Sequence, residues 1–222
     1  RPESIVFLGG ERAGLAIRCC KDAGYAGRMF AVHPKKTEIE GVPCVPRIAD
    51  LPVGPDAAFI GIPADATIEA VRDLAAKGAG GAVCYASGFA ELGEAGQKRN
   101  DALLAATGDL ALVGPNCFGV INYVNHGSLW PTWYPAQATN RGAAVIAQSG
   151  NLSINLSMNQ HEVPLSYIIS AGNQAVLGFE DYLDVLIDDP QVTAIGLFLE
   201  GVRDVPAFAK SCRKALERGM PL

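Results

Sequence analysis

The sequence predicts an α/β protein in which parallel sheets are covered by helices on both faces. Short apolar runs alternate with segments of helical periodicity along most of the 222 residues. These runs are apolar throughout, as expected of strands that are buried on both sides. Glycine (25 residues) and proline (14 residues) are plentiful while aromatic residues make up 7%, a composition that suits many tight turns between strands and helices.

The alternation is regular from residue 4 to residue 113. Continuous apolar runs predict strands, and apolar residues at helical spacing between them predict helices. The predicted strands are 4–10, 28–33, 56–62, 81–86 and 110–113, and the predicted helices are 13–23, 66–77 and 95–106.

The alternation breaks between residues 122 and 142, where Trp and Pro residues cluster and a polar run follows. We interpret this segment as a domain junction. Beyond it we expect strands 143–148, 166–170 and 193–199 and helices 151–160, 178–187 and 205–217. The sequence thus predicts one domain over 1–125, a junction over 126–142 and a second, incomplete domain over 143–222, since another strand is expected to begin near Met220.

Composition excludes several classes of function. A net charge of −5 argues against a general nucleic-acid binder, which needs excess Lys and Arg to neutralise phosphates. No apolar run reaches the roughly 18 residues that span a bilayer, and the first residues do not resemble a secretion signal.

The six cysteines form no C-x-x-C pair and no zinc-like spacing with histidine, so we expect no metal site and a reducing, cytoplasmic location. Charged residues make up only 18%, which suggests a surface covered by another domain or subunit.

Residues with turn chemistry follow the predicted strands of the first block. In open α/β sheets, ligands bind at the carboxyl ends of the strands. We therefore expect one long crevice bordered by these ends. The segments are 9–14 (G-G-E-R-A-G), 33–36 (H-P-K-K), 62–64 (I-P-A), 87–89 (S-G-F) and 114–117 (G-P-N-C).

The first of these segments favours a phosphate ligand but not a redox dinucleotide. Its glycine-rich turn opens a helix, whose free N–H groups can bind phosphate. The dinucleotide fingerprint needs glycine where Glu11 stands, and an acidic residue after the second strand, where Lys35 and Lys36 lie instead. Two lysines suit coenzyme A, which carries an extra ribose phosphate; the alternative is that they are solvated surface residues.

Several short motifs occur in a fixed order from residue 86 to residue 201. They are A-S-G-F-A-E at 86–91, G-P-N-C-F-G-V-I-N at 114–122, I-A-Q-S-G-N-L at 146–152, S-A-G-N at 170–173, and D-D-P-Q-V-T-A-I at 188–195 with L-E-G at 199–201. This ordered set resembles the NDP-forming acyl-CoA synthetases, in particular the CoA-binding subunit of succinyl-CoA synthetase and the ADP-forming acetyl-CoA synthetases. Ala147 departs from the family pattern, which has Ser at this position.

The resemblance implies a Rossmann-like CoA-binding domain followed by a flavodoxin-like domain of the succinyl-CoA synthetase type. The family commonly has a small hydroxyl residue where Glu11 or Arg12 stands, so Arg12 could supply a charge-assisted contact here instead. The residues that the resemblance places around CoA are Gly10, Glu11, Arg12, Ala13, Pro34, Lys36, Ile62, Pro63, Ser87, Gly88, Phe89, Asn116 and Cys117.

Three features of the sequence, one of them a run of three residues, each have two interpretations. Cys117 is either a small buried apolar residue or a residue that shapes the site near the CoA thiol. Ser149, Gly150 and Asn151 form either a plain helix cap or a phosphate-binding turn at a helix N-terminus. Glu200 is either a surface carboxylate or, as the resemblance implies, the residue that hydrogen-bonds and orients a catalytic histidine.

The resemblance also implies a reaction. A phosphoryl group moves from the nucleotide to a histidine and then to a carboxylic acid, and the CoA thiol attacks the acyl phosphate. His33, His126 and His161 do not match the family position, so we expect the histidine on residues beyond Leu222. ATP and Mg²⁺ are expected to bind an ATP-grasp domain or subunit outside this chain, and the family usually works as an oligomer.

Two other functions remain open at this stage. The chain could be a non-catalytic CoA-binding module, for example one fused to a protein acetyltransferase, or an NAD-dependent oxidoreductase. The acyl substrate is not evident: Trp130, Trp133 and Tyr134 could form a wall of an acid pocket or pack the domain junction.

Overall fold

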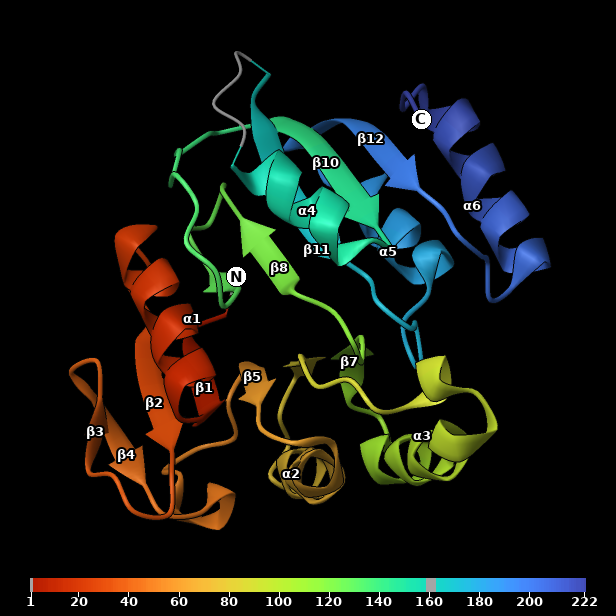
Figure 1. The fold of residues 1–222 in the computed structure, drawn as a ribbon. Coiled ribbons are helices and arrows are strands. Elements are labelled where there is room, and N and C mark those ends of the chain that lie inside the picture. Colours follow the sequence, from red (N-terminus) through yellow and green to blue (C-terminus); the bar gives the residue numbers. More distant parts are fainter. Residues whose placement is uncertain (1, 159–162) are drawn as a thin grey trace.

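The computed structural model describes residues 2–158 and 163–222 and contains two sheets (Figure 1). The first has the order β3-β4-β2-β1-β5-β6-β7. Its strands are β1 (Ser4–Gly9), β2 (Arg28–Val32), β3 (Glu38–Ile39), β4 (Val42–Val45), β5 (Ala57–Gly61), β6 (Gly81–Cys84) and β7 (Ala111–Val113), and the helices between them are α1 (Glu11–Asp22), α2 (Ala64–Ala76) and α3 (Glu94–Thr107).

The second sheet has the order β12-β10-β11-β8-β9. Strands β10, β11 and β12 are parallel, while β8 pairs antiparallel with both β11 and β9. Its strands are β8 (Gly119–Asn122), β9 (Ser128–Leu129), β10 (Gly142–Ala147), β11 (Leu165–Ser170) and β12 (Val192–Phe198), with helices α4 (Gly150–Ser157), α5 (Phe179–Leu186) and α6 (Val205–Arg218).

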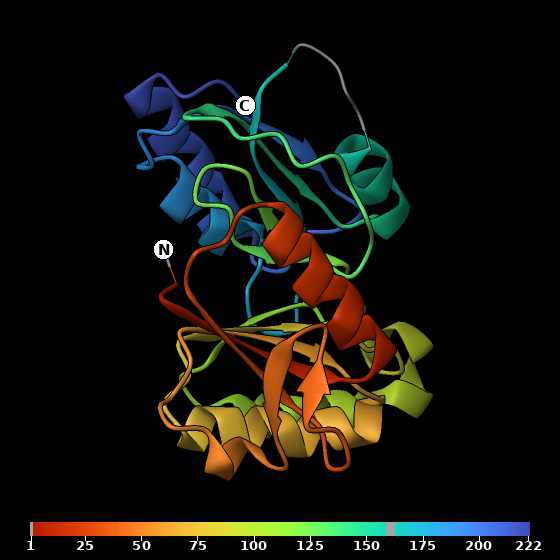
Figure 2. The same ribbon diagram turned by 90° about the vertical axis from the view of Figure 1, so that its left-hand side faces the viewer.

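Both faces of the first sheet are covered, as its apolar strands predict. Helices α2 and α3 pack on one face, and α1 together with the second sheet lies over the other (Figure 2). Strand β1 pairs in parallel with β2 and β5 and is buried along its whole length. The carboxyl ends of the parallel strands therefore lie along one edge of the first sheet.

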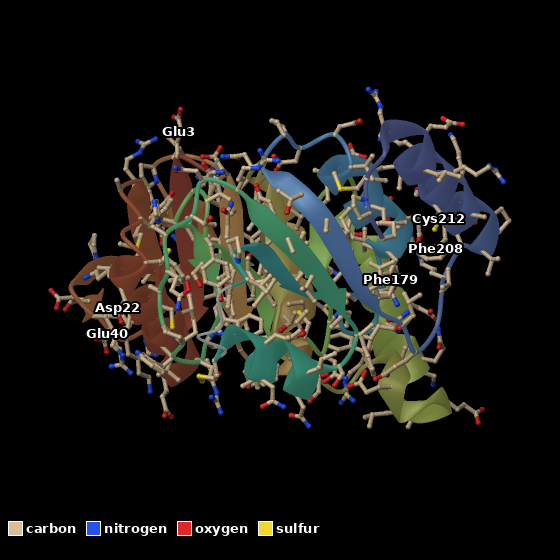
Figure 3. All side chains as sticks on the ribbon, turned by 90° about the horizontal axis from the view of Figure 1, so that it is seen from above. Glu3, Asp22, Glu40, Phe179, Phe208 and Cys212 are labelled. Carbon is tan, nitrogen blue, oxygen red and sulfur yellow. The ribbon has the colours of Figure 1, made fainter. Side chains whose placement is uncertain are left out.

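The second sheet also has two covered faces. Helix α4 packs on one face with residues of the junction, and α5 and α6 pack on the other. Figure 3 shows Phe179, Phe208 and Cys212 on the side of the molecule where α5 and α6 lie. After α6, the backbone N–H of Ile195 donates to the carbonyl oxygen of Pro221 at 2.9 Å, so the last residues approach the outer edge of β12.

The structure adds elements that the sequence did not predict. Strands β3 and β4 form a hairpin through Glu40 and Gly41, which both have positive φ (50° and 72°). Strands β8 and β9 belong to the second sheet, although residues 119–122 fall within the range expected for the first domain. The division of the chain into domains at residues 125 and 142 stays a prediction. The predicted helix 151–160 is described only as far as Met158.

The described part of the chain contains no helix with the length and hydropathy needed to cross a membrane.

Candidate functional site

The strand order of the first sheet arranges the predicted site segments in a row. Along the edge, the carboxyl ends follow the order β2, β1, β5, β6, β7. The segments after these strands therefore run in the spatial order 33–36, 10–13, 62–63, 87–89 and 114–117. Two lysines stand at one end of this row, and the turn that contains Asn116 and Cys117 stands at the other.

At the basic end, His33 shapes the turn after β2. Its Nδ1 atom accepts hydrogen bonds from the backbone N–H groups of Lys35 (3.1 Å) and Lys36 (3.2 Å). Pro34 and both lysines are exposed. The turn is therefore held by the imidazole, while the two ammonium groups stay accessible to an anion.

The next segment is the start of α1. Gly10 occupies the N-cap position without a side-chain cap, and a Cβ atom on it would meet nothing within 4 Å. Gly9 has φ 128°, and a Cβ atom there would lie 2.6 Å from the carbonyl oxygen of Gly61. This loop combines an uncapped helix N-terminus, open space and a required glycine, features that suit a phosphate group.

Arg12 and Glu11 lie in the first turn of α1, and both are exposed. The Arg12 guanidinium carbon lies 5.5 Å from the centre of the Tyr85 ring, which is a cation–π arrangement. Because Tyr85 follows β6, this contact links the first loop to the far half of the row.

A cavity of about 330 Å³ lies where the far end of the row meets the second sheet. Tyr85 and Phe118 form its aromatic wall, with ring centres 5.8 Å apart and planes at 85°. Gln148, Ser149, Gly150 and Asn151 of the β10–α4 turn also line it. The lining residues are Tyr85, Ser87, Asn116, Cys117, Phe118, Gln148, Ser149, Gly150 and Asn151.

Cys117 is buried and also borders the cavity, while its role near a CoA thiol stays a prediction. It is 3% exposed and packs in the core between the first sheet and α1. Its thiol donates to the carbonyl oxygen of Cys84 at 3.4 Å. Burial raises the pKa of the Cys117 thiol well above its ordinary value, so this residue shapes the cavity as a protonated thiol and is unsuited to nucleophilic attack.

Ser149 likewise combines a cap with a place in the cavity wall. Its Oγ atom accepts the backbone N–H of Leu152 at 3.3 Å and so caps α4. Gly150 allows the close approach of the aromatic wall, since a Cβ atom there would lie 2.8 Å from Cδ2 of Phe118. The first turn of α4 thus faces the cavity, and its dipole favours an anion there.

The segment 87–89 contributes mainly backbone. Ser87 is exposed and lines the cavity, and Gly88 has φ 110°. The Phe89 ring is fully buried in the core between the first sheet and the helices α2 and α3, so this residue can meet a ligand only through its main chain.

Glu200 lies in the bend two residues after the end of β12 and is exposed. Its backbone N–H donates to Oε1 of Gln148 at 2.5 Å, so it is connected to the cavity through Gln148. In the described ranges 2–158 and 163–222, the Glu200 carboxylate has no hydrogen bond or ion pair. Its proposed role toward a histidine stays a prediction.

The structure brings some predicted site residues together and separates others. The cavity gathers Ser87, Asn116 and Cys117 with the turn at 149–151, while Lys36 lies at the opposite end of the row. Sequence reasoning did not select Tyr85, Phe118 and Gln148, although Phe118 and Gln148 lie inside the motifs at 114–122 and 146–152.

The aromatic residues of the junction do not line this cavity. Trp130 and Tyr134 are buried and pack against Phe118 and Tyr123, respectively, while Trp133 is exposed. The structure thus supports junction packing for Trp130 and Tyr134. His126 is partly buried in the junction, and His161 lies outside the described residues.

Comparison with known proteins assigns both parts of the chain to families. Residues 10–123 match the family described as CoA binding domain, and residues 140–222 match the family described as succinyl-CoA ligase like flavodoxin domain.

Similar curated proteins are CoA ligases. A trans-feruloyl-CoA synthase from an unknown prokaryotic organism is 33% identical over 234 residues, with 100% of this chain and 33% of that protein covered. The ADP-forming acetate–CoA ligase I of Archaeoglobus fulgidus is 32% identical over 198 residues, covering 87% of this chain and 29% of that protein. The alpha subunit of the ADP-forming acetate–CoA ligase II of Pyrococcus furiosus is 29% identical over 86% of this chain and 42% of its own length. This chain therefore spans less than half of each of these relatives.

Solved structures extend the similarity to the fold. The apo form of acetyl-coenzyme A synthetase 1 from Ca. Korarchaeum cryptofilum matches 97% of this chain and 49% of its own, with a TM-score of 0.88 and 28% identity. A protein from Pyrococcus horikoshii matches 97% of this chain and 51% of its own, with a TM-score of 0.89 and 25% identity.

Proposed function

Because this chain belongs to the family that joins a CoA-binding domain to a succinyl-CoA ligase-like flavodoxin domain, we propose that it is the CoA-handling part of an NDP-forming acyl-CoA synthetase. One observation carries the proposal. A single cavity contains both the last strand ends of the CoA-binding sheet (Ser87, Asn116, Cys117) and the N-terminus of α4 (Ser149–Asn151). Such a cavity can bring a thiol and a phosphate together.

The residues along the row suit a coenzyme A molecule whose ribose phosphate lies at the lysine end and whose thiol lies at the cavity end. The ammonium groups of Lys35 and Lys36 suit the ribose phosphate, and the uncapped start of α1 at Gly10 suits the diphosphate. The row then leads past Ile62 and Pro63 toward the cavity, where the thiol end would lie.

Within the cavity, the chain's own residues would orient the reactants. The CoA thiol would lose its proton and attack the carbonyl carbon of an acyl phosphate, forming the thioester as the C–O bond to phosphate breaks and inorganic phosphate leaves. The first-turn N–H groups of α4 would bind the phosphate, and the protonated thiol of Cys117 would not compete as a nucleophile. Gln148 holds the turn that contains Glu200, and the Glu200 carboxylate would hydrogen-bond a catalytic histidine and orient its ring to accept a phosphoryl group.

The rest of the reaction requires further partners. Two of the similar relatives are named as alpha subunits, and one similar structure is described as a complex with phosphate and ADP. We infer that ATP and Mg²⁺ bind an ATP-grasp domain or subunit, that the assembly is oligomeric, and that it works in the cytoplasm.

Calorimetric titration of the chain with CoA and, separately, with NADH tests the proposal. We expect saturable heat with CoA, weaker binding in the Lys35→Met/Lys36→Met variant, and no heat with NADH. Saturable binding of NADH without binding of CoA would overturn it. In the intact polypeptide, transfer of labelled phosphate from ATP to histidine would distinguish an enzyme from a non-catalytic CoA-binding module.

A further inference from the structure

The Glu91 carboxylate holds the loop after β6 in shape. Its Oε1 atom accepts the backbone N–H of Gly88, and its Oε2 atom accepts that of Phe89 at 3.2 Å. Gly88 has φ 110°, so the loop turns sharply between Ser87 and the short 3₁₀ helix Ala90–Leu92. Two main-chain donors of a proposed CoA-binding loop are therefore satisfied by one side chain.

The same carboxylate reaches the second sheet. Nδ2 of Asn173, in the turn after β11, donates to Oε2 of Glu91. Asn173 is itself tied to the neighbouring turn of the first sheet, because its backbone N–H donates to the carbonyl oxygen of Pro115 at 2.9 Å and its Oδ1 atom accepts Nδ2 of Asn116 at 3.3 Å. Glu91, Asn173 and Asn116 thus form a chain of side-chain contacts across the two sheets.

The surroundings of Glu91 suit an ionised acceptor. Burial alone would raise the pKa of Glu91, but the hydrogen bonds from Gly88, Asn173 and Phe89 outweigh it and the pKa is lowered. Within the part of the chain that the structure describes, no Lys or Arg forms an ion pair with this carboxylate. Its charge is therefore balanced by N–H dipoles, and hydrogen bonds to a charged acceptor are stronger than neutral ones.

We propose that Glu91 is a positioning residue that fixes the loop 87–89 against Asn173, so that the wall of the cavity around the thiol end of CoA is complete only when the two sheets are docked. The inference rests on the proposed CoA function. Two residues of that wall, Ser87 and Asn116, belong to the segments that Glu91 and Asn173 hold together. Glu91 lies outside the lining itself and acts through these segments.

Glu91→Ala tests this role, with the exposed Glu69→Ala on α2 as the matched control. Hydrogen–deuterium exchange should accelerate at Gly88 and Phe89 and in segment 172–175, and CoA affinity should fall about tenfold or more, as expected for lost hydrogen bonds to a charged group. Adenosine 3′,5′-bisphosphate, which lacks the thiol arm, should bind Glu91→Ala as tightly as the wild type. Glu69→Ala should leave all three measurements unchanged.

A paired substitution provides a rescue. Glu91→Gln alone leaves one amide oxygen for the three N–H donors of Gly88, Phe89 and Asn173 and should weaken CoA binding. Glu91→Gln/Asn173→Asp restores a donor–acceptor pair across the two sheets with reversed polarity and should recover part of the affinity, because one backbone N–H of the loop still lacks its acceptor. Unchanged exchange and unchanged CoA affinity in Glu91→Ala would overturn the inference, as would an equal loss for CoA and the bisphosphate. If the wild-type chain bound no CoA, the proposed function would fail instead, and the exchange experiment alone would still decide whether Glu91 fixes the loop.

Discussion

The side-chain oxygen of Gln148, at the end of β10, accepts the backbone N–H of Glu200 at 2.5 Å. The same oxygen accepts the N–H of Gly201 at 2.8 Å, and Gln148 also lines the cavity. One amide group therefore fixes the turn after β12 relative to the cavity wall. The position of Glu200 therefore depends on a side chain that follows a neighbouring strand, β10.

Gln148→Ala should loosen this turn. The substitution removes the acceptor of two N–H groups, and because Glu200 and Gly201 are exposed, water can replace it. We therefore expect a loss of about 0.5–1.5 kcal/mol in the free energy of unfolding. Chemical denaturation measures it, with Gln97→Ala as the control, because Gln97 makes only a helix-surface hydrogen bond to Asp101. Equal stability of the two variants would contradict the role assigned to Gln148.

Gly172→Ala should damage the contact between the two sheets. Gly172 has φ 58°, and a Cβ atom there would lie 2.3 Å from the carbonyl oxygen of Pro115 and 2.8 Å from Cβ of Cys117. Gly219 has φ 66° with nothing within 4 Å, so Gly219→Ala isolates the backbone strain. We expect the free energy of unfolding to fall by about 1 kcal/mol in Gly219→Ala and by about 2–4 kcal/mol in Gly172→Ala. Thermal or chemical unfolding measures both values. A similar loss in both variants would show that the close contact is unimportant.

The sequence was most informative where burial is continuous. Strands β1 and β5 are paired on both sides and covered on both faces, so their apolar runs predicted them to within a residue or two at each end. Strand β8 alternates buried and half-buried residues and pairs antiparallel. It therefore lacks the continuous buried run by which the parallel strands were predicted. The two-residue strands β3 and β9 each pair antiparallel with a strand close in the chain, β4 and β8, and they are too short for a local periodicity to predict them.

The site was predictable in its segments but not in its contacts. The motifs drew attention to Asn116 and Ser149, and both residues line the cavity at turns after strands; their binding of CoA and phosphate stays a prediction. The position of Phe89 in the S-x-G-F motif gave no sign that its ring lies in the core. The role of Gln148 depends on the neighbour relation of β10 and β12, which are separated along the chain by β11.

His33→Ala should reduce the preference for CoA over dephospho-CoA. Without the imidazole acceptor, the N–H groups of Lys35 and Lys36 lose their partner and the turn no longer presents both ammonium groups together. Calorimetry with the two ligands should show a several-fold drop in the affinity ratio. His33→Asn is the control, because an asparagine side chain can accept the same N–H groups in an Asx turn. An unchanged ratio in His33→Ala would mean that the turn does not read the ribose phosphate.

Asp56 should make stability depend on acid pH. Hydrogen bonds from the backbone N–H groups of Glu3 and Ser4 lower the pKa of Asp56. A lowered folded-state pKa means that its contribution is present above the ordinary value near 3.9 and is lost as the pH falls through the folded-state value. Asp56→Asn keeps an acceptor but cannot titrate. The difference in unfolding free energy between the wild type and Asp56→Asn should therefore shrink below about pH 4, and a difference independent of pH would contradict this role.

Phe118 and Gly150 allow the shape of the cavity to be tested directly. A methyl group at position 150 would lie 2.8 Å from Cδ2 and 2.9 Å from Cε2 of the Phe118 ring, which is too close for carbon atoms in contact. In Gly150→Ala the ring must move, and its edge contact with Tyr85 allows movement only with rearrangement of the aromatic wall. We expect weaker binding of CoA and a lower unfolding temperature.

Phe118→Leu removes part of the ring and should make room for the added methyl group. The double variant Gly150→Ala/Phe118→Leu should therefore bind CoA more tightly than Gly150→Ala alone, although Phe118→Leu by itself loses part of the wall. A double-mutant cycle on CoA affinity measures this coupling, which we expect to be about 0.5–3 kcal/mol for residues in direct contact. Strict additivity would show that the two residues do not share the wall, and the cavity would then have to be assigned to other contacts.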